Sequence, residues 1–202
     1  MLKTTLSARP GQPPSRRRWI KLGVWAAGAT AAAGVAGAGM WMYQSGNDRQ
    51  LVFATLPQAM QEVDRLSAAG VQALVPATAW SWSQTLEHCA QSIEFSLRGF
   101  PAPKSALFQH TAGAAAFAAF AALGRMRHNL AEPIPGAPAL AAAAPDASAA
   151  LARLRQAVQD FAAHTGPLQP HFAYGPLGHA QYEQAHAMHL ANHLSAFDVR
   201  PV

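Results

Sequence analysis

Signals that begin and end helices recur from Thr55 to Pro201, and they constrain the fold more than any other feature of the sequence. Thr55 and Ser81 are each followed three residues later by a glutamine, which is the capping-box pattern of a helix N-terminus. Between these starts and the glycines or prolines that follow, apolar residues recur at three- and four-residue spacing. The sequence lacks the alternation typical of strands and any Asn-Gly hairpin. The pattern therefore predicts an all-α fold.

The same signals predict the bounds of five helices. We expect them at about residues 56–70, 82–99, 105–126, 147–165 and 179–198. The third is rich in alanine, and its apolar core, FAAFAAL, is too short to span a membrane. Four prolines between residues 132 and 148 predict a loop between the third and fourth helices.

Composition and charge narrow the class of protein. The chain has 202 residues, of which 50% are hydrophobic and 12% are charged, and this fits one domain with an appended segment. The net charge of +5 owes much to the cluster Arg16, Arg17, Arg18 and Lys21. No basic stripe interleaved with aromatic residues follows residue 50, so we do not expect nucleic-acid binding. The single cysteine, Cys89, cannot form an intrachain disulfide and is predicted to be a buried core thiol.

The N-terminus has the features of an export signal. The basic string SRRRWIK, residues 15–21, precedes a run from Leu22 to Tyr43 that contains no charged residue. This string resembles the twin-arginine (Tat) signature, with Arg16 and Arg17 as the arginine pair. Such a signal implies that the Tat machinery exports the protein after it has folded. The alternative is a plain signal anchor whose arginines follow the positive-inside rule.

The sequence is compatible both with cleavage of this segment and with its retention as a membrane anchor. Ala36-Gly37-Ala38 is an acceptable cleavage site, whereas residues 22–43 are about as long as the ~20 residues that span a bilayer. We therefore expect residues 1–45 to be a twin-arginine signal or a membrane anchor, and residues 50–200 to be the helical domain. The expected location is the periplasmic side of the bacterial inner membrane, anchored if uncleaved and soluble if cleaved near Ala38.

The stretch HAMHLANHL, residues 186–194, places three histidines in the last predicted helix. His186, His189 and His193 fall on the face that points to the core. A buried imidazole needs partners for both ring nitrogens, so this face must offer hydrogen bonds or a metal. His189 and His193 have the i, i+4 spacing that lets two imidazoles bind one ion, although two hydrogen-bonded core histidines would show the same spacing.

His88, in the second predicted helix, is the candidate third ligand. It lies opposite the apolar stripe of that helix, on the same side as Gln84 and Gln91. The side chain could face solvent, or it could face a polar cleft in which the two glutamines hydrogen-bond to the metal-binding histidines. The helical wheel leaves both possibilities open.

Three stretches resemble a known bacterial family, called domain of unknown function 1569, which is a branch of the DinB-like helical bundles. They are WSWSQTLEHCAQSIEFSLRGFP, HTAGAAAFAAFAALGRMRHNLAEPIPGAPAL and HFAYGPLGHAQYEQAHAMHLANHLSAF, and the resemblance extends from about Phe53 to Val199. It implies a four-helix bundle, here with one additional alanine-rich helix. In this superfamily one histidine of the second helix and an H-x-x-x-H pair of the last helix hold a divalent metal. The matching residues are His88, His189 and His193.

The final helix departs from the family pattern. The family commonly has H-L-D-H-H-L where this chain has HLANHL, so an aspartate and a histidine are missing while the three ligand positions remain. His186 matches no family position and is predicted to support the ligands or to belong to the core. His171 does match, in the HxxxGPL loop, where it could line a pocket or stabilise a turn.

Two functions are compatible with these features. Three neutral imidazoles leave a coordination position open, as in catalytic zinc sites, and an open site can activate water or bind a thiolate. The first interpretation is an exported protein that binds zinc or nickel and could act as an enzyme on a small molecule, either S-transferase-like, as in some DinB-like relatives, or hydrolytic. The second is a non-catalytic, membrane-anchored periplasmic bundle that serves as a structural or interaction module. A homodimer is compatible with either.

Overall fold

The computed structural model describes residues 49–200. The predictions about Arg16, Arg17, the uncharged run at residues 22–43 and cleavage near Ala38 lie outside the described residues.

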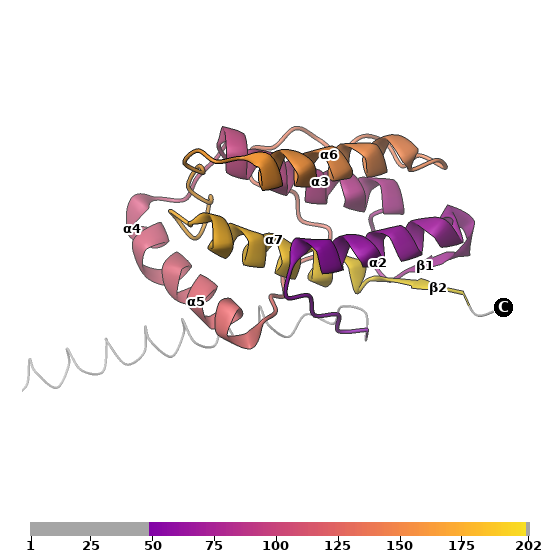
Figure 1. Cartoon of the computed structure of the whole chain (residues 1–202), viewed down its shortest axis with the longest axis horizontal. Helices are drawn as coiled ribbons and strands as arrows, with labels where there is room; N and C mark the ends of the chain where they lie inside the picture. The colour runs from indigo at the N-terminus through magenta and orange to yellow at the C-terminus, as the bar shows by residue number, and fades with distance from the viewer. Residues whose placement is uncertain (1–48, 201–202) are drawn as a thin grey trace, which may run out of the picture. The chain divides into compact units, whose positions relative to one another are not determined.

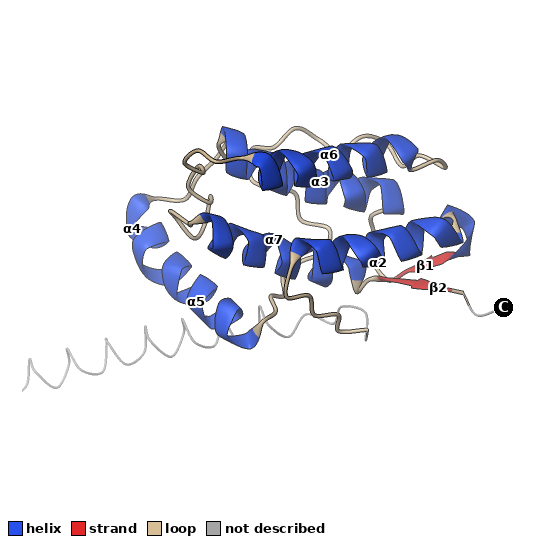
Figure 2. Ribbon diagram, viewed as in Figure 1, coloured by secondary structure: helices blue, strands red, loops and turns tan. Residues whose placement is uncertain are grey.

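The described part of the chain is mainly helical (Figures 1 and 2). In chain order its elements are α2 (Leu56–Ala69), a short 3-10 helix (Val71–Ala73), β1 (Leu74–Pro76), α3 (Trp82–Arg98), α4 (Ala106–Phe108), a π-helical turn (Gln109–Gly113), α5 (Ala114–Leu123), α6 (Ser148–Ala163), α7 (His179–Leu194) and β2 (Phe197–Val199).

Four of these helices enclose one hydrophobic core. α3 packs along α6, α2 packs along α7, and α3 also contacts α7, so the two pairs form a bundle (Figure 1). Each helix contributes its apolar stripe, including Leu66 of α2, Ile93 of α3, Leu154 of α6 and Leu190 of α7, all fully buried. The helical periodicity of the sequence therefore becomes the interior of the bundle.

The predicted helix starts at Thr55 and Ser81 are confirmed. The Ser81 hydroxyl accepts a hydrogen bond from the Gln84 amide at 3.3 Å, and the Gln84 side chain accepts from the Ser81 amide at 3.1 Å. The Thr55 hydroxyl accepts from the amide of Gln58 at 3.4 Å. The corresponding helices end at Gly70 and Gly99, whose positive φ angles of 80° and 105° favour glycine.

The prediction of an entirely helical fold is wrong at one edge. β1 and β2 form an antiparallel ribbon in which Leu74 pairs with Val199 and Pro76 with Phe197. The last helix, expected to reach residue 198, ends at Leu194, and the chain then extends into β2. Strands of three residues are too short to show a two-residue period, so the sequence pattern could not reveal them.

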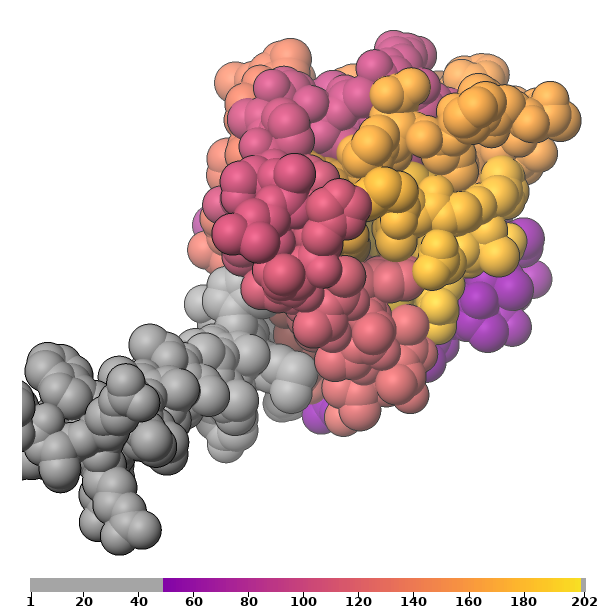
Figure 3. All heavy atoms as spheres, turned by 90° about the vertical axis from the view of Figure 1, so that its left-hand side faces the viewer, coloured from indigo at the N-terminus to yellow at the C-terminus, as the bar shows by residue number. Residues whose placement is uncertain are grey.

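The alanine-rich segment forms one helical run, Ala106–Leu123, through α4, the π turn and α5. Its 18 residues are long and apolar enough to cross a membrane by length and composition alone, a test that helices of soluble proteins also pass. Phe117 and Phe120 hold it to the bundle by packing with Met188 of α7. Most of its surface is exposed, as Figure 3 shows from that end of the molecule.

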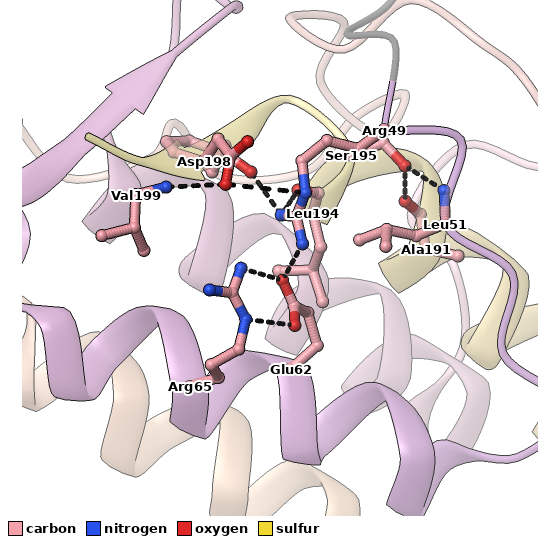
Figure 4. A network of polar contacts seen from close by, with 10 residues as sticks. Arg49, Leu51, Glu62, Arg65, Ala191, Leu194, Ser195, Asp198 and Val199 are labelled. Carbon is pink, nitrogen blue, oxygen red and sulfur yellow. Dashed lines mark hydrogen bonds and ion pairs between the residues drawn. The ribbon is translucent and has the colours of Figure 1, made fainter. Parts of the chain in front are cut away.

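A polar network ties the segment before α2 to the end of α7 (Figure 4). Arg49 pairs with Glu62 of α2 and donates hydrogen bonds to the carbonyl oxygens of Leu194 and Phe197. Arg65 binds both carboxylate oxygens of Glu62 at 2.8 Å. These contacts fix the C-terminal end of α7, the helix that carries two of the candidate ligands.

Candidate metal centre

The structure brings His88, His189 and His193 together between α3 and α7. One ring nitrogen from each histidine lies within 4.8 Å of the other two. The Nε2 atoms of His88 and His189 are 3.2 Å apart. Two nitrogens at 2.0–2.1 Å from a tetrahedral zinc ion are about 3.3 Å apart, so this separation suits two ligands of one ion.

His88 faces the bundle interior, and only 2% of its surface is exposed. The solvent-facing alternative is therefore wrong. The proline-rich loop covers the polar side of α3, because Gln91 donates to the carbonyl of Pro138 at 3.2 Å and Glu87 accepts from the amide of Ala141 at 2.9 Å. The helical wheel could not predict this contact, because the loop lies about fifty residues further along the chain.

Burial keeps the three imidazoles neutral. It lowers the pKa of His88 to about 3, and it lowers the pKa values of His189 and His193 well below their ordinary range, with neighbouring imidazoles adding to the effect. A neutral imidazole is the form that binds a metal, so no proton has to leave these rings at pH 7.

The donor set fits a divalent metal. The buried Nε2 atom of His193 has no hydrogen-bond partner, and neither do the Nδ1 atoms of His88 and His189. A buried polar atom without a partner costs about 1–3 kcal/mol, and a shared ion would give the His193 nitrogen a partner. Apolar side chains would fill the same space without that cost.

Two aromatic residues that were not predicted from the sequence, His128 and Trp80, also lie against the cluster. The ring of His128 lies 5.1 Å from that of His189 and 4.9 Å from that of His193, between centroids. Trp80 packs on His88 at 4.7 Å and stacks on His193 at 6.0 Å. Both residues lie outside the helices and their periodicity, and the only signal that could have found them is their place in the stretches that carry the family resemblance.

The orientation of His128 follows from its hydrogen bond. Its Nδ1 lies 3.0 Å from the carbonyl oxygen of Asn129, which can only accept, so Nδ1 carries the proton. Nε2 then keeps its lone pair. Burial is the largest cause of the lowered pKa of His128.

His186 and His171 lie apart from the three clustered nitrogens. The Nε2 of His186 shares a hydrogen bond with the Ser96 hydroxyl at 3.2 Å, and its ring packs on Phe161. The Nδ1 of His171 accepts from the amides of Ala173 and Tyr174 at 3.1 and 3.2 Å. The geometry thus places His186 in the core and supports the turn-stabilising interpretation of His171.

The two glutamines expected to support the ligands point elsewhere. Gln84 donates to the carbonyl of Ala141 at 3.3 Å as well as capping α3, and Gln91 binds Pro138. Loop carbonyls outside regular structure need donors, and these amides supply them. In the described structure the hydrogen bonds of both glutamines hold the proline-rich loop against the polar side of α3.

Cys89 is the next residue after His88, but its side chain is not part of the histidine cluster. It is 1% exposed, and burial raises the pKa of its thiol to about 12. The prediction of a buried core thiol is confirmed.

The fold and the site together define a mainly helical bundle with a buried cluster of three histidines, compatible with metal binding. The chain belongs to the family described as protein of unknown function, DUF1569, whose sequence model matches residues 46–200. No curated protein and no solved structure matches the chain.

Proposed function

We propose that this protein is a DinB-like bundle that binds one divalent metal ion, zinc or nickel, through His88, His189 and His193. The observation that carries the proposal is the convergence of three neutral, buried imidazoles, with the Nε2 atoms of His88 and His189 3.2 Å apart and that of His193 unpartnered. Open three-histidine sites are typical of catalytic rather than structural zinc.

The arrangement suits chemistry on a small molecule. A bound metal would act as a Lewis acid toward water or a thiolate at its open position. Trp80 and the surrounding helices shield the imidazoles from water, which strengthens the interactions of a bound charge. We therefore favour an S-transferase-like or hydrolytic enzyme over a structural module.

Metal analysis of the full chain, purified without a histidine tag, tests the proposal. We expect about one zinc or nickel ion per chain, and loss of that ion when His88, His189 or His193 is replaced by alanine. His179→Ala is the matched control, because His179 contacts Phe161 rather than the cluster. Excess zinc should raise the thermal midpoint of the parent and the control but not of the three variants.

A metal-free parent protein that also shows no thermal shift with zinc would contradict the proposal. It would favour the alternative, a non-catalytic membrane-anchored module with a polar core.

We further propose that the protein is exported by the twin-arginine route and works on the periplasmic side of the inner membrane, anchored through residues 22–43 or released near Ala38. The Arg16–Arg17 pair and the uncharged run that follows support this proposal. A domain that must fold around a metal suits a pathway that carries folded proteins.

A further inference from the structure

A surface pocket lies beside the candidate metal centre. It forms where the chain after α5 meets the loop before α3, the segment before α2 and the end of α7. Its lining residues include Gln50, Arg125, Arg127, His128 and Asn192. Its volume of about 210 Å³ greatly exceeds the about 10–15 Å³ that a single water molecule requires, so it can admit a small organic molecule.

The pocket lining contributed by residues 49–200 is cationic. Arg125 and Arg127 both belong to it, and no Asp or Glu of these residues does. Four other arginines of residues 49–200 pair with acidic side chains, whereas none of the ion pairs of that region involves Arg125 or Arg127. Among residues 49–200, the Arg125 guanidinium donates a hydrogen bond to the Gln50 side chain at 3.4 Å. The charge of Glu132 acts on His128, but Glu132 does not line the pocket.

His128 connects the pocket to the histidine cluster. The residue lines the pocket, and its ring packs on His189 and His193. Asn192, next to His193 on α7, also lines the pocket and donates to the carbonyl of His128 at 3.5 Å. The His128 side chain therefore lies between a molecule in the pocket and the candidate ligands His189 and His193.

We propose that this pocket binds a small molecule through an oxyanion group, a carboxylate or a phosphate, held by Arg125 and Arg127. Guanidinium groups match the geometry of both anions and bind them through paired, charge-assisted hydrogen bonds. That the bound anion is the substrate of the metal centre rests on the proposed function, while the anion site itself does not.

Isothermal titration calorimetry of the full chain tests the site, with succinate and inorganic phosphate as separate probes at constant ionic strength. The protein is first made metal-free and then freed of chelator. We expect saturable binding of at least one probe, and the preferred probe distinguishes carboxylate from phosphate recognition. The double variant R125Q/R127Q should bind about ten-fold more weakly or worse.

Arg98→Gln is the matched control, because it removes one exposed arginine that does not line the pocket. It should bind like the parent, and circular dichroism should show that all variants keep their helices. Equal affinity in the double variant and the parent, or no saturable binding of either probe, would overturn the proposal. Anion binding by a protein that contains no metal as purified, before any chelator treatment, and that takes up no added zinc would refute the proposed function and leave the anion site intact.

Discussion

Burial of histidine is the dominant feature at the residue scale. His171 and His186, outside the candidate ligand set, both have a pKa lowered to about 3, chiefly by burial. In the unfolded chain the same groups titrate near 6.5, so between about pH 6.5 and 3 the unfolded state binds more protons. The free energy of unfolding is therefore highest above pH 6.5. It falls as the pH decreases below 6.5, because the unfolded chain binds protons that the buried rings do not.

We therefore expect acid to destabilise the metal-free protein well above the range in which carboxylates titrate. Each buried histidine should remove up to about 1.4 kcal/mol of unfolding free energy per pH unit below about 6.5. Urea unfolding at pH 7.5, 6.5, 5.5 and 4.5 measures this slope. His186→Gln should show a shallower slope than the parent, and a free energy that is constant from pH 7.5 to 4.5 would contradict the assignment.

The sequence predicted some residues of the candidate site well. The i, i+4 spacing identified His189 and His193, and His88 was the candidate third ligand, whose position the family resemblance matched. The position of His128 and the hydrogen-bond partners of Gln84 and Gln91 were not predicted, because they depend on where the loops lie. Loop placement follows from contacts between distant residues, and these have no local period.

At the scale of elements, the π turn of the alanine-rich helix packs closely against the turn before α7. Gln109 donates to the carbonyl of Phe172 at 3.2 Å from within this π turn. A Cβ atom at Gly113 would lie 1.8 Å from the carbonyl oxygen of Ala173. Only glycine lets the two backbones approach so closely, although the φ angle of −65° is ordinary helix.

Gly113→Ala should therefore destabilise the protein by about 1–3 kcal/mol, because the turn must move away from the new methyl group. Helix propensity alone predicts the opposite sign, a gain of about 1 kcal/mol. Chemical unfolding of the variant decides between them. Ala112→Gly, at the exposed neighbouring position, should lose only about 1 kcal/mol, and a stabilised Gly113→Ala would refute the close packing.

Element types were easier to predict than element ends. Caps at Thr55 and Ser81 and stops at Gly70 and Gly99 are local chemistry, and the sequence contains them. The end of α7 is not local, since Ser195 accepts from the amide of Leu51 at 2.9 Å while the following residues pair with β1. That end is determined by a segment more than one hundred residues earlier.

At the scale of the whole molecule, the candidate metal centre joins the two helix pairs. His88 belongs to the α3–α6 pair, and His189 and His193 belong to the α2–α7 pair. The three nitrogens therefore converge only when both pairs have docked, so metal binding and folding should be coupled.

The proposed route of export can be tested at the arginine pair. Replacing Arg16 and Arg17 by lysine keeps the charge but removes the arginine pair, so the folded domain should stay in the cytoplasm. Cell fractionation followed by immunoblotting measures the distribution. Arg18→Lys is the control, because it replaces a neighbouring arginine that is not part of the pair, and it should not alter delivery. Normal delivery of the double variant would indicate the general secretory route instead.

The burial of Cys89 gives the molecule an internal reporter of its own opening. The chain has one cysteine, 1% exposed and one residue from His88 on α3. A thiol reagent can reach it only after α3 separates from its neighbours, so the labelling rate, followed by intact mass, counts these events without any engineered probe. An ion shared by α3 and α7 would slow that rate in proportion to its occupancy, and metal affinity could then be obtained from labelling kinetics alone.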